Sequence, residues 1–271
     1  MSDPVKAVIF DWAGTIVDFG SRAPMGAFVE AFRRFGVDIT IAEARGPMGL
    51  AKRDHIRALG TLPGVEAAWR AAQGSAFDDA AIDRVYAVFV PLNAEVVTDY
   101  ADFIPGALDT VAALRGRGIR IGSTTGYTRE IMARLLPVAA AGGYSPDNLV
   151  CAGDLAAGRP GPLMMYRSFA DLGVWPASAC VKVDDTEPGI GEGVAAGCWT
   201  VGLALSGNMA GLSRAEMDRL SSRQQAAIRE DATTKLIAAG ADYVIDSVAD
   251  LLPVIDDLGD RIRAGERPDA N

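Results

Sequence analysis

Short hydrophobic runs alternate along this chain with longer segments that carry apolar residues at helical spacing. The first run, residues 5–10, is apolar on both side-chain parities, which is typical of a strand buried on both faces of a parallel sheet. Further strands are predicted at residues 118–123, 148–152, 180–183, 199–205 and 243–245. Helices are predicted between them at residues 105–117, 128–141, 160–172, 187–196 and 213–239, with a last helix ending near residue 262. This alternation predicts an α/β fold with a doubly wound parallel sheet.

One segment departs from the alternation. From about residue 22 to residue 100 the pattern is helical and carries little strand signal. Helices are predicted here at residues 24–35, 42–59, 65–73 and 78–97. Pro24 suits a first helical turn and Gly36 suits a helix end. We therefore expect an α/β core made of residues 1–20 and 101–271, and an inserted helical domain made of residues 21–100.

Composition and charge narrow the classes of partner. Hydrophobic residues make up 49% of the 271 residues and charged residues 23%, which is an ordinary globular balance. The net charge is −9 and no block of Lys or Arg stands out, so nucleic acid and anionic membranes are not expected as partners. No apolar run reaches the length of a membrane span, and three cysteines in apolar segments are expected to be buried free thiols. We expect a cytoplasmic protein without a signal peptide.

Polar residues collect where the predicted strands end. Asp11 follows the first strand, Thr125-Gly126 the second and Asp184-Asp185 the fourth, while Arg159 precedes a predicted helix. Ligands of open α/β sheets bind beyond the carboxyl ends of the strands, so we expect these side chains to meet there. Taken singly, each could instead cap a turn or a helix. Together they suit phosphoryl chemistry, with a carboxylate nucleophile, carboxylates on Mg²⁺, and a hydroxyl and a guanidinium on phosphoryl oxygens.

Four motifs, in their order along the chain, resemble those of the haloacid dehalogenase superfamily. They are Asp11-Trp12-Ala13-Gly14-Thr15, Ser123-Thr124-Thr125-Gly126, Gly158-Arg159-Pro160 and Val183-Asp184-Asp185. The helical insertion is similar to the superfamily's cap domain, and the resemblance spans nearly the whole chain. It implies a haloacid dehalogenase-like core with Asp11 as the nucleophile. The superfamily's phosphatases and mutases carry a second Asp, which protonates an oxygen leaving group, where this chain has Ala13.

A rare lysine in the insertion offers another way to stabilise a leaving group. Of 26 basic residues only four are lysines, and Lys52 lies three residues before His55, the single histidine. An amine condenses with a carbonyl to a Schiff base, which a guanidinium cannot do. An iminium then accepts the electron pair of a carbon leaving group, so no acid is needed at residue 13. The alternative is a lysine on a solvated helix face.

The segment around Lys52 is similar to the cap motif of the phosphonatase family within this superfamily, and the similarity extends to residues 9–15, 122–127 and 199–202. The resemblance implies hydrolysis of the C–P bond of phosphonoacetaldehyde, in 2-aminoethylphosphonate degradation, through an Asp11 aspartyl-phosphate and a Lys52 Schiff base. It implies Mg²⁺ held by Asp11, the Ala13 carbonyl and Asp185, and a homodimer formed through the caps. The residues implied to bind the substrate or its phosphoryl group are Thr125, Gly126, Arg159, Met48, His55 and Tyr127.

Two other interpretations stay open. A capped phosphatase or phosphomutase would act on an ester, although Ala13 argues against this. A catalytically silent module would bind Mg²⁺ and a phosphorylated metabolite. A further question concerns Gly189, because many members of the superfamily carry another Asp at that position. Asp184 is a candidate to replace it as an outer-sphere carboxylate.

Overall fold

The structure is a computed structural model that describes residues 3–268; the outermost residues of the predicted core lie outside this range. The described residues form one six-stranded sheet in which every pairing is parallel. Its strands are β1 (Ala7–Phe10), β2 (Arg120–Thr125), β3 (Val150–Cys151), β4 (Cys180–Asp184), β5 (Trp199–Leu203) and β6 (Tyr243–Ile245). The order β3-β2-β1-β4-β5-β6 places β1 in the middle, where the direction of winding reverses. The predicted α/β fold with a doubly wound parallel sheet is confirmed.

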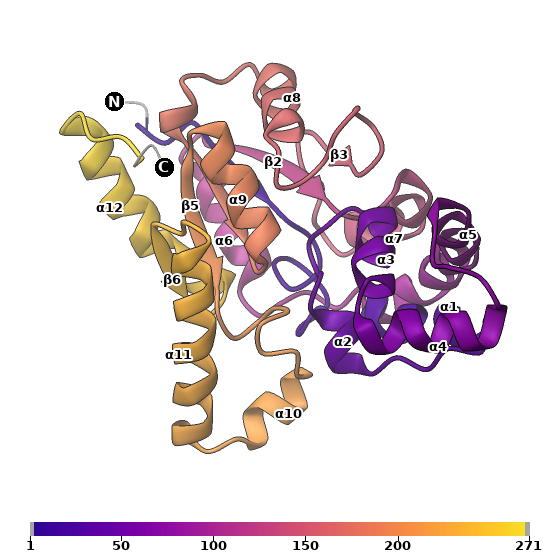
Figure 1. Ribbon diagram of the computed structural model, residues 1–271. Helices are drawn as coiled ribbons and strands as arrows, with labels where there is room; N and C mark the ends of the chain where they lie inside the picture. The colour runs from indigo at the N-terminus through magenta and orange to yellow at the C-terminus, as the bar shows by residue number, and fades with distance from the viewer. Residues whose placement is uncertain (1–2, 269–271) are drawn as a thin grey trace.

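Helices cover both faces of the sheet (Figure 1). One face carries α6 (Ala107–Gly116), α7 (Arg129–Ala141) and α12 (Leu251–Arg263), and the other carries α8 (Leu163–Leu172), α9 (Glu187–Ala196) and α11 (Ser222–Ala238). Val8 and Phe10 belong to the first apolar layer, whereas Ala7 and Ile9 pack on the opposite face with Met165 of α8. Both parities of β1 are apolar because both of its faces are buried.

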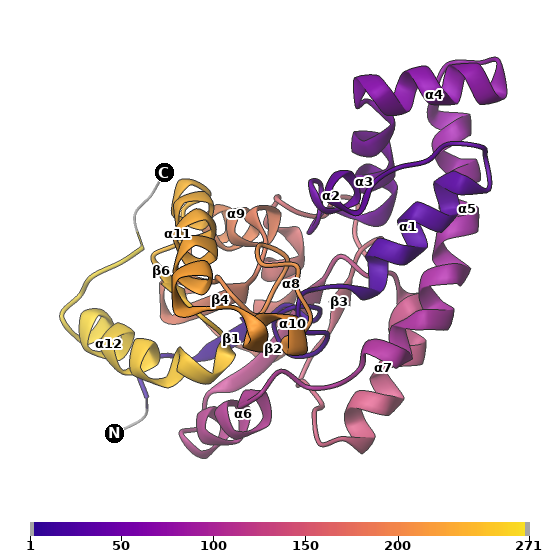
Figure 2. The same ribbon diagram turned by 90° about the horizontal axis from the view of Figure 1, so that it is seen from below.

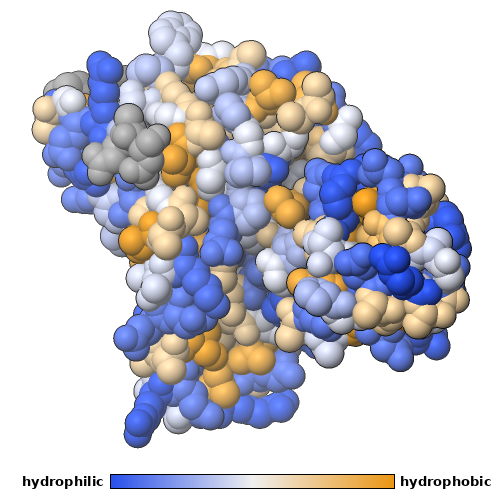
Figure 3. Space-filling view, in the orientation of Figure 1, coloured by the Kyte–Doolittle hydropathy of each residue, from blue (hydrophilic) through white to orange (hydrophobic). Residues whose placement is uncertain are grey.

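Five helices between β1 and β2 form a separate lobe beside the carboxyl ends of the strands (Figures 1 and 2). They are α1 (Ala23–Arg33), α2 (Ile41–Arg45), α3 (Lys52–Gly60), α4 (Pro63–Gln73) and α5 (Asp79–Val96). We call residues 21–100 the helical unit. Its interior is aromatic: the Phe28 and Phe89 rings stack with centroids 4.1 Å apart, and Trp69 meets Phe77 edge-on at 4.8 Å. The outer surface of this lobe mixes hydrophilic and hydrophobic residues (Figure 3).

The two linkers to the helical unit are paired with each other. The Asp18 N–H donates to the Asp102 carbonyl at 3.1 Å, and the Ile104 N–H donates to the Ile16 carbonyl at 2.9 Å. The Asp18 carboxylate also accepts from the N–H groups of Arg22 and Ala23, both at 2.9 Å, where α1 begins. The entry to α1 is therefore anchored to the core by one acidic side chain.

Three predicted helices have different limits in the structure. The segment 42–59 is two helices, α2 and α3, because Pro47 and Gly49, whose φ is +93°, interrupt the helical backbone between them. The segment 213–239 is also two helices, α10 (Arg214–Arg219) and α11, since Ser221 starts a new helix with a capping box to Gln224. The helix predicted from residue 160 begins at Leu163, so Arg159 lies in a turn.

The remaining elements are the short 3₁₀ helices η1 (Val97–Tyr100), η2 (Ala177–Ala179) and η3 (Val248–Asp250). Cys151, Cys180 and Cys198 are buried free thiols, as predicted. None of the helices that residues 3–268 form is long and apolar enough to cross a lipid bilayer.

Candidate active site

Asp11 directly follows the central strand β1, where its side chain is buried at the carboxyl edge of the sheet. Its N–H donates to the Val183 carbonyl of the neighbouring strand at 3.0 Å. Its Oδ1 accepts from Arg159 Nη2 at 2.8 Å. Burial and the nearby Asp184 carboxylate raise the pKa of Asp11 to about 6, although Arg159 and Lys182 act in the opposite direction.

Asp184 and Asp185, at the end of β4, complete a buried acidic cluster with Asp11, in which carboxylate oxygens of all three lie within 4.8 Å of one another. Asp185 accepts from the Asn208 N–H at 2.6 Å. A Cβ at Gly14 would lie 2.2 Å from Asp185 Oδ2, so the backbone of the Asp11 loop closes directly over this carboxylate. Burial, Asp11 and Asp184 raise the pKa of Asp185 well above its ordinary value.

Arg159 joins the strand ends from the turn before α8. Besides Asp11, its Nη2 donates to the Thr124 carbonyl at 2.8 Å, and its Nε donates to Glu192 Oε2 at 3.1 Å. Lys182 lies beneath it in β4, with Nζ 3.2 Å from Glu192 Oε2 and 3.1 Å from Asp184 Oδ2. Glu192 thereby fixes the plane of the guanidinium that faces Asp11.

Asp184 occupies the space that a side chain at residue 189 would need. Its Oδ1 accepts from the N–H and hydroxyl of Thr186, at 3.0 and 2.7 Å, and its Oδ2 lies 3.3 Å from Arg159 Nη2. A Cβ at residue 189 would lie 2.0 Å from the Asp184 carboxyl carbon. Gly189 is therefore sterically required by Asp184, and a carboxylate reaches this place from residue 184 instead of residue 189.

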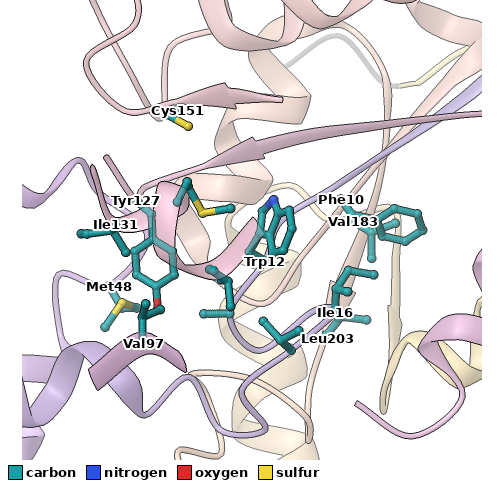
Figure 4. Packing of buried hydrophobic residues seen from close by; sticks show 14 of the residues in the cluster. Phe10, Trp12, Ile16, Met48, Val97, Tyr127, Ile131, Cys151, Val183 and Leu203 are labelled. Atoms are coloured by element: carbon teal, nitrogen blue, oxygen red, sulfur yellow. The ribbon is translucent and has the colours of Figure 1, made fainter. Parts of the chain in front are cut away.

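Lys52 reaches the same site from the helical unit. It is the first residue of α3 and only 3% exposed. Its Nζ lies 3.9 Å from Met48 Sδ and 5.2 Å from the centre of the Tyr127 ring, and Figure 4 shows Met48 beside Tyr127. Burial lowers the pKa of Lys52 to about 8, although Asp11 acts in the opposite direction. The amine therefore has an apolar wall behind it and the acidic cluster ahead of it.

The loop before Lys52 packs directly on the core. Gly49 has a φ of +93°, and a Cβ there would lie 2.3 Å from Thr186 Oγ1. A Cβ at Gly126 would lie 3.0 Å from the Leu50 carbonyl oxygen. These two close approaches need glycine, and they place the helical unit in a closed position over the strand ends.

One small cavity of about 20 Å³ joins most of the residues that the sequence singled out. Its lining includes Asp11, Ala13, Met48, Lys52, Thr125, Gly126, Tyr127 and Arg159. His55 lies behind this wall, with its ring stacked on Phe28 at 3.9 Å and its Nε2 2.8 Å from the Ala44 carbonyl oxygen. Asp185 contributes through the acidic cluster at the floor of the site.

Several site residues escaped the sequence analysis. Ser21 and Thr186 also line the cavity, and Glu192 forms ion pairs with both Arg159 and Lys182. A signal for Glu192 exists in the sequence: it is a charged residue between glycines in a helix of small residues, Gly189–Ala196. Such a helix packs closely on the sheet, so a charge on its inner side needs buried partners.

Comparisons with known proteins agree with this geometry. A family model described as haloacid dehalogenase-like hydrolase matches residues 5–197. A protein of Paraburkholderia xenovorans named phosphonoacetaldehyde hydrolase is 60% identical over 264 residues, which cover 97% of this chain and 99% of that protein. A protein of Salmonella typhimurium with the same name is 54% identical over 266 residues, with 97% and 99% covered.

A solved structure supports the same assignment. A phosphonoacetaldehyde hydrolase-like protein from Oleispira antarctica superposes with a TM-score of 0.96 at 44% identity, covering 98% of this chain and 96% of that one. Identity at this level over nearly the full length of the relatives shows a shared family. The chain therefore belongs to the haloacid dehalogenase-like hydrolases, and within them it is an enzyme of the phosphonoacetaldehyde hydrolase family.

Proposed function

We propose that this enzyme hydrolyses the C–P bond of phosphonoacetaldehyde to acetaldehyde and orthophosphate. The observation that carries the proposal is the placement of the buried Lys52 amine in the cavity that also contains Asp11 and Arg159. A nucleophilic amine, a nucleophilic carboxylate and a phosphoryl-binding guanidinium thus share one cavity. The substrate carries a carbonyl for the first group and a phosphonate for the other two.

The residues at the floor of this cavity fit a divalent cation. Four carboxylates are buried there, those of Asp11, Asp184, Asp185 and Glu192. Among the described residues, two cations, Arg159 and Lys182, are in ion-pairing contact with them. With all four carboxylates ionised, the cluster would carry two more negative charges than these two cations supply, and Asp185 has no cationic partner within the pairing distance of the described ion pairs. We propose that Asp11, Asp185 and the Ala13 carbonyl hold Mg²⁺, which when bound neutralises charge on the phosphoryl oxygens.

Lys52 begins the reaction in this proposal. Its neutral amine adds to the aldehyde carbon, and loss of water gives an iminium joined to the enzyme. The closed loop at Gly49 keeps bulk water from this bond. Arg159 and the Thr125–Gly126 turn hold the phosphonate oxygens, so the phosphorus faces the Asp11 carboxylate.

Asp11 then takes the phosphoryl group. A carboxylate oxygen attacks phosphorus as the C–P bond breaks. The electron pair of the C–P bond moves into the iminium to give an enamine. The enamine takes up a proton and is hydrolysed, which releases acetaldehyde and regenerates the Lys52 amine. Water cleaves the aspartyl phosphate to orthophosphate and the Asp11 carboxylate. No acid is needed at residue 13, because the electrons leave toward nitrogen and no oxygen leaving group forms.

One assay separates this proposal from its rivals. The enzyme is expected to release phosphate and acetaldehyde in equal amounts from phosphonoacetaldehyde, and to act far more slowly on para-nitrophenyl phosphate. Preferred hydrolysis of the ester would favour a phosphatase, and no release from either compound would favour a silent binding module. Ala13 supports the first outcome, since an ester oxygen would leave without a proton donor at that position.

The Schiff-base step should depend on pH through the Lys52 amine. Trapping of the imine by borohydride should become faster as the pH rises and level off above about 8, because only the deprotonated amine adds to the carbonyl. At pH 7 a lysine with a pKa of about 8 has roughly 300 times more free amine than an ordinary lysine. The measurement is the initial labelling rate from pH 6 to 10 by intact-protein mass spectrometry. A rate still rising steeply between pH 9 and 10 would contradict a lowered pKa.

Replacing Asp184 and replacing Asp185 should weaken Mg²⁺ binding to different degrees. We expect Asp185→Asn to weaken Mg²⁺ binding about 100-fold or more, and Asp184→Asn about 10-fold. The reason is that Asp184 already pairs with Arg159 and Lys182, whereas Asp185 has no partner among the described ion pairs and its Oδ1 accepts only a long hydrogen bond, at 3.5 Å from Thr15 Oγ1. Isothermal titration of the substrate-free protein measures both, with the exposed Asp83→Asn as a control for unspecific charge loss. Equal weakening of Mg²⁺ binding in the two variants would contradict the assignment of Asp185, and not Asp184, as the direct Mg²⁺ ligand.

Further parts of the proposal concern the setting of the enzyme. We propose a homodimer formed through the helical units, acting in the cytoplasm in 2-aminoethylphosphonate degradation. The support is the resemblance of the cap motif to that of the phosphonatase family. Light scattering after size exclusion should give a mass of two chains, and a single-chain mass across micromolar concentrations would rule the dimer out.

A further inference from the structure

Arg45 connects the helical unit to the core by hydrogen bonds. It is the last residue of α2, and its guanidinium reaches the loop that follows β5. Nη1 donates to the Gly20 carbonyl at 2.9 Å and to Asn208 Oδ1 at 3.2 Å, and Nη2 donates to the Gly211 carbonyl at 2.9 Å. Within residues 3–268, no other side chain from α1 to α5 has a described hydrogen bond to the core.

The core loop is shaped around this guanidinium. Gly211 has a φ of +64°, and a Cβ there would lie 2.5 Å from Arg45 Cζ. Only glycine leaves room for the guanidinium against the backbone at this point. The fork of Arg45 can satisfy separate carbonyls with its two Nη atoms, which a single ammonium group cannot do. The backbone of this loop and the Arg45 guanidinium are therefore sterically complementary.

The same loop also holds Asp185. The Asn208 side chain accepts from Arg45, while the Asn208 N–H donates to Asp185 Oδ2 at 2.6 Å. Ser206 ties the loop to the Asp11 segment, since its hydroxyl donates to the Gly14 carbonyl at 2.9 Å. Gly20, the other partner of Arg45, donates its N–H to the Ser206 carbonyl at 2.7 Å. One guanidinium thus contacts the loop that positions a carboxylate of the acidic cluster.

We propose that Arg45 is a positioning residue that latches the helical unit closed and, through Asn208, sets Asp185 only in the closed state. Closure brings Lys52 to the cavity, so the latch couples delivery of the amine to completion of the phosphoryl site. The inference rests on the proposed function for its substrate. The Arg45 hydrogen bonds are present without a substrate, so they can be tested in the substrate-free protein.

The test compares Arg45→Ala and Arg45→Lys with Arg53→Ala. Arg53 is a matched control, because it lies in the same unit and pairs with Asp79 and Asp83, which also belong to that unit. In Arg45→Ala we expect kcat/KM for phosphonoacetaldehyde to fall about 10- to 100-fold. We expect kcat to fall about threefold or less, because saturating substrate still closes the helical unit over the core. Arg45→Lys should recover only a part of the loss, and Arg53→Ala should match the unmodified enzyme.

Hydrogen exchange of the substrate-free protein provides the second measurement. Amides of residues 46–51 and 206–211 should exchange about 10-fold faster in Arg45→Ala, with the sheet unchanged. Gly211→Ala, whose Cβ would occupy the place of the Arg45 guanidinium, should reproduce this pattern. Unchanged exchange in Arg45→Ala, full recovery by Arg45→Lys, or an equal defect in Arg53→Ala would overturn the latch. Absence of phosphonoacetaldehyde cleavage by the unmodified enzyme would overturn the proposed function instead, and the exchange result would still decide the latch.

Discussion

Lys52→Arg should be as inactive as Lys52→Ala, with turnover of phosphonoacetaldehyde reduced about 10⁴-fold or more, the scale expected when a covalent nucleophile is lost. Arginine keeps the positive charge and nearly the length of the side chain, and it binds phosphoryl oxygens well. It cannot present a neutral amine, so an imine cannot form. The comparison therefore separates Schiff-base chemistry from simple attraction of the phosphonate. The measurement is steady-state phosphate release with Mg²⁺ present.

The other lysines supply the control for this prediction. Borohydride with substrate should label Lys52 and spare Lys6, Lys182 and Lys235. Lys182 is the stringent comparison, because it is fully buried near the same strand ends. Its Nζ donates to Thr124 Oγ1 at 2.7 Å and forms ion pairs with Asp184 and Glu192, and it does not line the cavity that contains Lys52. A label on Lys182, or appreciable turnover by Lys52→Arg, would contradict the Schiff base on Lys52 and favour a phosphatase.

Asp11→Asn should abolish phosphate release, with a loss of about 10⁴-fold or more, while imine formation on Lys52 continues. The two steps are separable because Asp11 acts on phosphorus and Lys52 acts on carbon. The substitution keeps the size of the side chain but leaves a neutral amide oxygen, which is a poor nucleophile. Mass spectrometry after borohydride reduction should find one modified lysine in the variant, together with no phosphate in solution.

A second observation guards against a folding defect in this variant. Asp11 is buried against Arg159, and loss of its charge leaves that guanidinium with Asp184, Glu192 and the Thr124 carbonyl as partners. We therefore expect Asp11→Asn to fold, with a melting temperature close to that of the unmodified enzyme. Normal phosphate release by a folded Asp11→Asn would remove the nucleophile assignment. Loss of the lysine label in a folded variant would contradict the separation of the two steps.

The sequence by itself was enough for the sheet and for the residues at its edge. The apolar runs identified six strands because β1 to β5 are almost wholly buried and β6 is half-buried, and this local signal does not depend on the rest of the chain. Parallel strands all end at one edge, so Asp11, Thr125 and Asp185 could be brought together before any coordinates. The helical insertion was visible for the same reason, as a change of period.

Tertiary structure alone decided how these parts act on one another. Periodicity did not reveal the break at Gly49 that makes Lys52 the first residue of α3, because a helix of 42–59 has the same apolar spacing. Nor could it tell which carboxylates are neutralised: among residues 3–268 Asp184 has cationic partners and Asp185 is in no ion pair, owing to the placement of Arg159, Lys182 and the glycine at residue 189. Electrostatic pairing and close approach depend on distances of a few ångströms between segments far apart in the chain. A sequence pattern records the period of each segment, and only the packed chain sets those distances.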